Sequence, residues 1–522
     1  MIGSEMHAEE TGNRSSGIIF KSRCVSVHLL KIFLVFCLIG ICLRAEVTMP
    51  PIFGDHMVLQ QGVTLPIWGS ASPGERISLS FGQINESTFA DSFGNWRITL
   101  RPLPATAAPL FMVINGRNRI EFDDVIIGDV WICAGEVNMA FPISEASAGK
   151  DIDDKIYDPK LRFFKEGEPA SLTNGKSAGT YKKMKGHWVV CTPQTISSLS
   201  AVGYFFARDV RSSHHLPVGM IQCTRERTPI ISWISRKGLS KSPAILGISN
   251  APEGGAFNKG MSAPSSCFDR LIQPLIPYAI TGVIWYQGES DEGNAALQYR
   301  RTFQRLIRDW RDHWGEGPFP FYFVSLAGFG AEGGPAVEGY HGADGSVSRG
   351  WPWIREGAAG ALCLPGTGMA QACDLGVPDD REPSDKLDVG RRLALLARHR
   401  VYGEELVDSG PTYRGIKIKG DKVRIDFDSA GGGLVIGTSP DKAGDFSSSL
   451  VTSLKGFALS GSDRKWFPAH GRIEGKSVLL WSDAVPHPVA VRYGWKGFPN
   501  GSLYNQEGLP AAPFRSDDYQ PE

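Results

Sequence analysis

The feature that most constrains the fold is a series of five apolar segments between Val125 and Gly376. They read VIIGDVWICAG (125–135), LPVGMIQC (216–223), AITGVIWYQG (279–288), FYFVSLAG (321–328) and GMAQACDLG (368–376). Helical stretches alternate with them, and strands that alternate with helices form a mostly parallel sheet covered on both faces. Ligands of such sheets bind beyond the carboxyl ends of the strands. The sequence therefore predicts an α/β fold with a candidate site where these segments end.

Two of the intervening stretches have a clear helical period. In the stretch from about Asn294 to Trp314, large apolar residues recur at spacings of three and four and so share one face. They are Tyr299, Phe303, Leu306, Ile307, Trp310 and Trp314. The arginines of this stretch lie largely off that face, which indicates a solvated surface rather than an anion site. A second helix is predicted from about Lys386 to Tyr402.

The length of 522 residues predicts several domains rather than one core. Residues 46–124 and 405–522 read as short strands between Gly- and Pro-rich turns, which predicts an antiparallel β-domain on each side of an α/β domain at 125–404. The stretch 328–350 is rich in Gly, Ala and Ser without periodicity. We interpret it as a long loop beside the site, either a lid or a disordered segment.

The first 45 residues have the pattern of a secretory signal. Basic residues precede an apolar run from Ile32 to Leu43, and small-residue cleavage is expected after Ala45. The protein is therefore expected to be exported, secreted or periplasmic; an uncut N-terminal membrane anchor is the alternative. Lys+Arg and Asp+Glu are both 55, and this zero net charge argues against nucleic acid or an anionic membrane as the main partner.

Six cysteines follow the signal segment: Cys133, Cys191, Cys223, Cys267, Cys363 and Cys373. An even number in an exported protein permits disulfides. Their irregular spacings and apolar surroundings favour small buried side chains for most of them. Neither a CxxC pair nor an HExxH motif occurs, so no metal site is predicted.

One predicted strand ends in an unusual turn. GDVWICAG runs into Glu136-Val137-Asn138-Met139, an arrangement of strand, glycine, polar turn and helix start that often presents a nucleophile in α/β hydrolases. No Ser, Cys or Thr stands at its tip. Valine has no lone pair with which to attack a carbonyl carbon.

The chain resembles the sialate O-acetylesterase family, within the SGNH-type carbohydrate esterases. The resemblance rests on blocks in the same order over nearly all of the mature chain. They include MPPIFGDHMVLQQ (49–61), GDVWICAG (128–135), GVIWYQGES (282–290), YRRTFQRLIRDW (299–310), DVGRRLALLA (388–397) and LYNQEGLPAAPFRSDD (503–518). The resemblance implies a three-layer α/β sandwich and removal of acetyl groups from sialic acids or other carbohydrates. It also implies a serine nucleophile, a histidine base and no cofactor.

The chain departs from the family at the positions that carry the chemistry. The family's first turn reads Gly-Gln-Ser-Asn-Met, which puts the nucleophile at Val137. The family's Asp-Ile-His-Pro stretch puts the base at Glu382 and the acid that orients it at Asp380. The oxyanion region would comprise Gly135, Asn138, Glu226 and Arg227, and the last two replace glycines that allow close backbone approach to a ligand.

The block from Trp285 to Ser290 is intact. Gln287 and Glu289 in it, with Asp291 and Glu136, are candidates for substrate binding. The alternative is that Gln287 and Glu289 have a structural role, because polar groups that end a buried strand need hydrogen-bond partners in any case.

Several replacements add charge around the old pocket. Carboxylates appear at Glu136, Glu226, Asp291 and Glu382, and cations appear at Arg225, Arg227 and Arg381. We expect salt bridges that plug the pocket, since buried charges must be paired. The alternative is an acid pair or cation site formed by Glu136 and Glu382.

The leading hypothesis is a pseudoenzyme, inactive or severely impaired as an esterase, that still binds a carbohydrate such as an O-acetylated sialic acid. One alternative is a working carbohydrate esterase with a relocated nucleophile, at Ser290, Ser144 or Ser384. Another is a purely structural or binding module.

Overall fold

The computed structural model describes residues 46–151, 157–167, 185–242, 262–330, 350–437 and 453–519. Its main sheet has the strand order β13, β12, β11, β7, β10, β8, β9. The bounds are β7 (Arg119–Gly135), β8 (Asp158–Glu166), β9 (Gly186–Cys191), β10 (Val218–Thr224), β11 (Gly282–Tyr286), β12 (Phe321–Ser325) and β13 (Thr367–Gln371). Neighbours are parallel except β8 and β9. The predicted α/β fold is confirmed, and the five predicted segments supply β7, β10, β11, β12 and β13.

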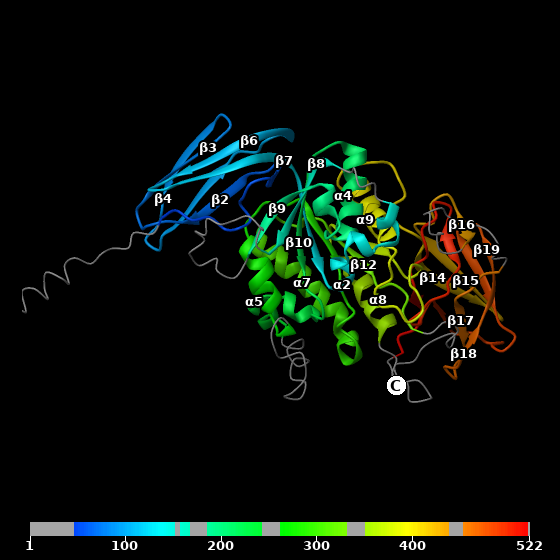
Figure 1. Ribbon diagram of the computed structural model, residues 1–522. Coiled ribbons are helices and arrows are strands. Elements are labelled where there is room, and N and C mark those ends of the chain that lie inside the picture. The colour runs from blue at the N-terminus through cyan, green and yellow to red at the C-terminus, as the bar shows by residue number, and fades with distance from the viewer. Residues whose placement is uncertain are drawn as a thin grey trace, which may run out of the picture. The chain divides into compact units, whose positions relative to one another are not determined.

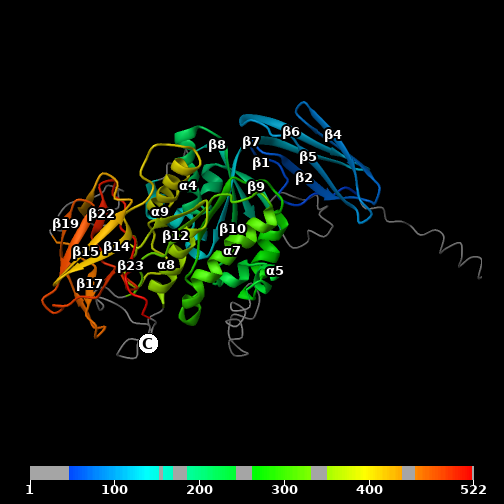
Figure 2. The same ribbon diagram turned by 180° about the vertical axis from the view of Figure 1, so that it is seen from behind.

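Helices pack on both faces of this sheet (Figure 1, Figure 2). The longer ones are α4 (Ala201–His214), α7 (Tyr299–Trp314), α8 (Trp351–Ala359) and α9 (Leu387–Arg400). On one face, the ring of Trp131 lies 5.0 Å from that of Phe206 on α4. On the other, the ring of Trp285 lies 5.8 Å from that of Trp310 on α7. Trp285 is in register with Ala134, three residues after Trp131, so strand alternation directs the two tryptophans to opposite faces.

The two predicted helices form close to their expected bounds. Helix α7 follows the 3-10 segment η8 (Gly293–Gln298) and ends at Gly315, which has φ +71° and caps the helix in the left-handed conformation. All six residues of its predicted apolar face are buried. The second predicted helix is α9. Shorter helices are α2 (Val137–Ala140), α3 (Pro193–Ile196), α5 (Arg236–Ser240), η1 (Ile143–Glu145), η2 (Ser147–Asp151), η3 (Ile230–Trp233), η6 (Phe268–Ile272), η7 (Gln273–Leu275) and η9 (Gly360–Cys363).

Strand β7 also joins the main sheet to the N-terminal strands. Those strands are β1 (Val58–Gln60), β2 (Leu65–Ser70), β3 (Arg76–Phe81), β4 (Ile84–Phe89), β5 (Asn95–Leu100) and β6 (Thr106–Asn115). The first residues of β7 pair with β6 and its last residues pair with β10 and β11. Its burial changes from alternating to continuous at Val125. The predicted boundary at 124/125 therefore falls inside one strand, and the division into domains stays a prediction.

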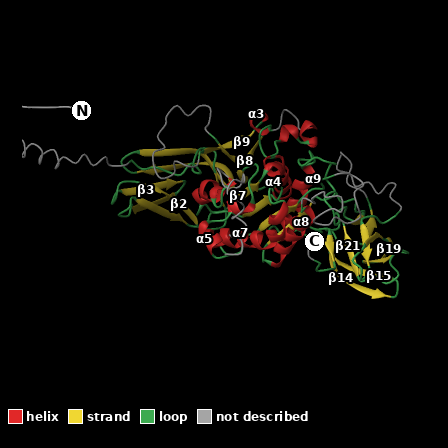
Figure 3. Cartoon of the chain, turned by 90° about the horizontal axis from the view of Figure 1, so that it is seen from below, coloured by secondary structure: helices red, strands yellow, loops and turns green. Residues whose placement is uncertain are grey.

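The C-terminal strands have a hydrophobic core of their own, which includes Val423, Ile425, Val478 and Leu480. The strands are β14 (Thr412–Lys419), β15 (Lys422–Asp428), β16 (Leu434–Ile436), β17 (Phe457–Ser460), β18 (Trp466–Pro468), β19 (His470–Glu474), β20 (Ser477–Trp481), β21 (Ala490–Tyr493), β22 (Leu503–Asn505) and β23 (Phe514–Arg515). Figure 3 shows several of them gathered together with loops between them. Arg515 fastens this part to α8, where its Nε lies 2.8 Å from Oε1 of Glu356.

The six cysteines after residue 45 form no disulfide with one another, and Cys363 is the exposed one. None of the helices that the structure describes is long and apolar enough to cross a membrane. The predicted signal at 1–45, and 331–349 of the predicted loop, lie outside the described residues.

Candidate functional site

The sheet brings three strand ends to one level. Gly135 at the end of β7 is in register with Thr224, the last residue of β10, and with Tyr286, the last residue of β11. The residues that follow each strand therefore emerge side by side. This alignment places the turn at Glu136 between Arg225 on one flank and Gln287 on the other, as predicted for a site at the carboxyl edge of the sheet.

The turn after β7 is fully formed. Gly135 has φ +141°, and a Cβ atom there would lie 1.9 Å from the carbonyl oxygen of Tyr286, so only glycine fits. The next amide, that of Glu136, donates a 2.9 Å hydrogen bond to the same carbonyl. Val137 then begins helix α2 and is half-buried. The backbone thus has the form of a nucleophile turn, and its tip carries an isopropyl group.

Beneath the turn, a hydrogen-bond network links Glu136 to the residues after β11. The Nε2 of Gln287 donates to Oε1 of Glu136 at 2.7 Å and to Oδ2 of Asp291 at 2.5 Å. The hydroxyl of Tyr299 donates to Oε1 of Gln287 at 2.9 Å, which fixes the orientation of the amide. The hydroxyl of Ser290 donates to Oε2 of Glu136 at 2.5 Å. The structure therefore brings together Glu136, Gln287 and Asp291, three of the predicted binding residues.

Asn138 holds a second network. Its Nδ2 donates to Oε1 of Glu289 and, at 2.9 Å, to the carbonyl oxygen of Arg381. Its Oδ1 accepts a 2.6 Å hydrogen bond from the ammonium of Lys386. A carboxamide has two N–H donors, and both are engaged here. Asn138 consequently has no side-chain donor left for an oxyanion, although its place in the turn had predicted that role.

Burial dominates the electrostatics of this inner region. Glu136 is 1% exposed, and burial with the nearby charges of Glu289 and Asp291 raises its pKa well above the ordinary value. Burial likewise raises the pKa of Glu289, and it raises that of Asp291 to about 7. Burial lowers the pKa of Lys386 to about 8. Low-dielectric surroundings disfavour the charged form of every one of these groups, so burial favours the protonated form of the three carboxyls and the neutral form of the lysine.

The other predicted residues lie at the surface. Glu226, Arg227 and Glu382 are exposed, and Asp380 is half-buried and accepts a 2.8 Å hydrogen bond from the amide of Glu382. Arg227 has φ +53°, a strained conformation for a residue with a side chain. Exposed charged side chains thus stand at 226 and 227, the two positions at which the resemblance predicts oxyanion glycines.

Among the described residues, the expected salt bridges across the pocket do not form. Arg225 pairs with Glu166 at 2.6 Å, and Arg381 pairs with Glu292, so neither cation reaches the new carboxylates. Arg227, the third predicted cation, is exposed and forms no ion pair with another described residue. Glu136 is satisfied instead by the neutral donors Gln287 and Ser290. The described residues also contain no group of three or more Asp, Glu, His or Cys side chains that could hold a metal ion.

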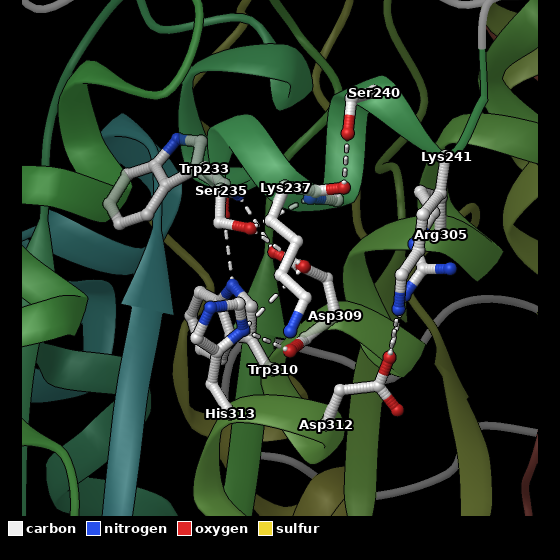
Figure 4. A network of polar contacts seen from close by, with 11 residues as sticks. Trp233, Ser235, Lys237, Ser240, Lys241, Arg305, Asp309, Trp310, Asp312 and His313 are labelled. Atoms are coloured by element: carbon white, nitrogen blue, oxygen red, sulfur yellow. Dashed lines mark hydrogen bonds and ion pairs between the residues drawn. The ribbon is translucent and has the colours of Figure 1, made fainter.

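A Ser–Asp–His contact also exists away from the turn, on α5 and α7 (Figure 4). The hydroxyl of Ser235 donates to Oδ1 of Asp309 at 2.8 Å, and Oδ1 of Asp309 lies 3.6 Å from Nδ1 of His313. The carboxylate stands between the hydroxyl and the imidazole, whereas a catalytic base must contact the nucleophile. Ser235 caps α5 by accepting from the amide of Gly238. The cluster is therefore structural.

Two residues of the site were missed by sequence reasoning. Lys386 stood next to the predicted base, but no sequence signal marks a lysine that will be 0% exposed. Tyr299 was assigned only to the apolar face of α7; its hydroxyl is what orients Gln287. Ser290 was proposed as a relocated nucleophile, and the structure adds its contact with Glu136.

Comparisons with known proteins find carbohydrate esterases. The family described as carbohydrate esterase, sialic acid-specific acetylesterase, matches residues 128–344. The sialate O-acetylesterase of Homo sapiens is 26% identical over 501 residues, covering 88% of this chain and 90% of the human protein. That of Mus musculus is also 26% identical, covering 88% of this chain and 92% of the mouse protein. A carbohydrate acetylesterase from Xanthomonas citri is 33% identical with a TM-score of 0.76, covering 91% of this chain and 100% of that chain.

Proposed function

Because this chain belongs to the sialic acid-specific acetylesterase family of carbohydrate esterases, we propose that it is a carbohydrate-binding protein that has lost the family's esterase reaction. The observation that carries the proposal is Val137, which occupies the tip of an intact nucleophile turn. In a serine hydrolase, loss of the nucleophile alone lowers turnover roughly a million-fold. The turn has kept its backbone and lost its reactive atom.

The residues at the base position and in the oxyanion region also disfavour the esterase reaction. Glu382 stands at the base position, and it is exposed and has no hydroxyl at position 137 to activate. The carboxylate of Glu226, at a position where the family has glycine, would repel a developing oxyanion rather than stabilise it. Both N–H donors of Asn138 are already engaged.

Acetate release from O-acetylated sialic acid and from acetylated neutral sugars tests the loss of activity. We expect no release by the unchanged full chain and partial recovery in Val137→Ser/Glu382→His, with Glu226→Gly/Arg227→Gly added where the double variant stays silent. Val137→Ala is the matched control, because it removes apolar bulk without adding a nucleophile. Release by the unchanged chain that Val137→Ala leaves intact would overturn the proposal.

A second candidate function is favoured by one contact, the 2.5 Å hydrogen bond from the Ser290 hydroxyl to Glu136. In this reaction the Ser290 oxygen attacks the acetyl carbonyl and its proton passes to the Glu136 carboxylate. The sugar leaves as the free alcohol, and water then hydrolyses the acetyl-serine. The raised pKa of Glu136 strengthens it as a base but lowers the fraction that is ionised.

A fluorophosphonate probe separates the two candidates, because it labels only activated nucleophiles. Labelling of the native chain that disappears in both Ser290→Ala and Glu136→Gln would establish the second candidate. Ser144→Ala is the control, since Ser144 is also a serine near the turn, and it is exposed. Absence of labelling in the native chain would remove the second candidate and agree with the first.

We also propose that the protein is exported through its first 45 residues. The basic flank, the apolar run and the small residue at Ala45 support this. N-terminal sequencing of the mature protein from the producing cells is expected to begin at Glu46. An intact N-terminus in the membrane fraction would contradict cleavage.

A further inference from the structure

A cavity of about 430 Å³ opens beside the turn, at the carboxyl ends of β8 and β10. Lys165 and Glu166 line it from β8, Gln222 and Thr224 line it from β10, and Arg225 and Glu226 follow β10. Helix α2 contributes Ala140. Small-molecule sites typically measure roughly 300 to 1,000 Å³ and are mostly apolar. This cavity has the right size, and its lining residues are polar or charged apart from Ala140, which suits a ligand covered with hydroxyl groups.

The charges of the wall cancel one another. Arg225 donates from one nitrogen to both carboxylate oxygens of Glu166, at 2.6 and 2.7 Å. The ammonium of Lys165 donates to the hydroxyl of Ser198 at 2.7 Å, and Glu226 supplies the second carboxylate. The Nε of Arg225 is enclosed and has no hydrogen-bond partner among the described residues. The wall therefore offers hydrogen-bond donors without net positive charge.

Several carboxylates lie near the turn itself. Burial, and then the negative charge of Glu226, raises the pKa of the Glu382 carboxyl, so these two carboxylates interact electrostatically. Asp380 and Glu145 act on Glu382 in the same direction.

The cation that opposes these charges is Lys386, which is enclosed and already committed. Its ammonium donates to Oδ1 of Asn138 at 2.6 Å and to the carbonyl oxygen of Pro383 at 2.5 Å. Nearby Arg381 is neutralised by Glu292. A ligand entering beside Val137 therefore meets these carboxylates, and the exposed cation Arg227, next to Glu226 in the sequence, is not among the residues that line the cavity.

We infer that this cavity is the carbohydrate subsite and that Glu226 makes it select sugars without a carboxylate, with amine-bearing sugars bound most tightly. The inference rests on the proposed function and adds the chemical class of the ligand. Like charges at the rim repel a sugar acid such as sialic acid, and the same carboxylates attract a protonated sugar amine.

Calorimetric titration of the full chain with two matched ligand pairs tests the inference. Lactose and 3′-sialyllactose differ by the sugar acid, and tetra-N-acetylchitotetraose and chitotetraose differ by free amines. At low salt we expect chitotetraose to bind about tenfold tighter than its acetylated partner, and sialyllactose to bind more weakly than lactose. Both differences should shrink at 0.5 M salt, because salt screens exposed charges.

Two charge-matched variants locate the effect. Glu226→Lys is expected to lower the affinity for chitotetraose about tenfold, to raise that for sialyllactose and to change that for tetra-N-acetylchitotetraose least, because this sugar carries no charge. Glu121→Lys changes the net charge equally at an exposed site on the first part of β7 and should change none of them. Thr224→Tyr narrows the cavity and should weaken every sugar that binds, provided its thermal unfolding matches the native chain.

The outcomes separate the inference from the proposed function. Sialyllactose binding more tightly than lactose, or sugar binding that Glu226→Lys and Thr224→Tyr both leave unchanged, would overturn the inference while carbohydrate binding stood. Failure of all four sugars to bind would overturn the inference and the binding half of the proposed function together. Acetate release by the native chain would overturn the loss of activity alone.

Discussion

The site has a buried half and an exposed half, and the charged groups of the two halves are held in different ways. The buried half comprises Glu136, Asn138, Gln287, Glu289 and Asp291, and the exposed half comprises Glu226, Arg227 and Glu382 around Val137. In the buried half every carboxylate accepts a hydrogen bond from a neighbouring side chain. In the exposed half, no ion pair joins these described residues to one another. Charge is constrained by packing in one half and free to face a ligand in the other.

This difference indicates that the residues that maintain the fold and the residues at the proposed reactive positions are separate sets. A change in the buried half leaves a polar group without a partner, which costs about 1–3 kcal/mol. A change in the exposed half has no such cost and can replace a reactive group while the fold persists. Val137 is half-buried, and Glu226, Arg227 and Glu382 are exposed, so under the proposed assignment the nucleophile, base and oxyanion glycines can be lost without loss of the turn.

The largest expected effect lies in the turn that both halves share. Gly135→Ala places a Cβ atom 1.9 Å from the Tyr286 carbonyl oxygen at φ +141°, so it should lower the free energy of unfolding by about 4 kcal/mol or more, or prevent folding. Urea unfolding measures this. Gly54→Ala is the control, because nothing lies within 4 Å of its added Cβ. Equal stability of the two variants would contradict the described turn.

Removal of the buried cation should have the next largest effect. Lys386→Met leaves the Asn138 Oδ1 and the Pro383 carbonyl without their donor, and it takes a positive charge away from Glu289. We expect a loss of roughly 3 kcal/mol in the free energy of unfolding. Lys417→Met, at a lysine with 78% of its side chain exposed, should change stability little. If Lys386→Met lowered the free energy of unfolding by less than about 1 kcal/mol, the proposed difference between the buried and the exposed half would be contradicted.

The sequence was a good guide to the fold where one pattern dominated. The apolar face of α7 was predicted residue by residue, because six large side chains at helical spacing leave little choice. Strands β8 and β9 were missed. In β8 only Leu161–Phe164 is continuously buried, between charged residues at both ends, and so short a segment has neither alternation nor length as a signal.

The site was less predictable for a different reason. The family resemblance identified Glu136, Gln287 and Asp291 as candidates, but the sequence could not show that one amide bridges the two carboxylates or that Ser290 completes the set. It also predicted that Arg225 and Arg381 would plug the pocket, because it could not show that Glu166 and Glu292 already pair with them. Which residues pair across a long sequence separation depends on how the fold brings them together in space.

The buried carboxylates make stability depend on pH. Burial raises the pKa of Asp291 from 3.8 to about 7, so the folded chain keeps a proton that the unfolded chain has released. The free energy of unfolding should therefore fall as pH rises from about 4 to about 7. The shift corresponds to at most roughly 4 kcal/mol, and neighbouring groups share it, so we expect about 2 kcal/mol.

The isosteric variant Asp291→Asn should flatten this pH dependence, measured by urea unfolding from pH 4 to pH 8. Its carboxamide oxygen can still accept from Gln287 and from the amide of Ile230. Asp428→Asn, at a position with 61% of its side chain exposed, is the control. A native chain that gains stability as pH rises over this range would contradict the assignment.

The smallest effect is expected in the exposed half, where Glu226→Gln should change the free energy of unfolding by no more than about 0.5 kcal/mol. The same variant should lower the pKa of Glu382 toward its ordinary value, because a neighbouring negative charge that favours the protonated form has been removed. Carbon-detected NMR titration of the Glu382 carboxyl measures this shift, and Glu121→Gln, remote from the turn, should leave it unchanged. Loss of stability without a change in that titration would mean that Glu226 supports the fold and does not act electrostatically on Glu382. The distinction between the buried and the exposed half would then fail at Glu226, the residue on which the proposed ligand selection depends.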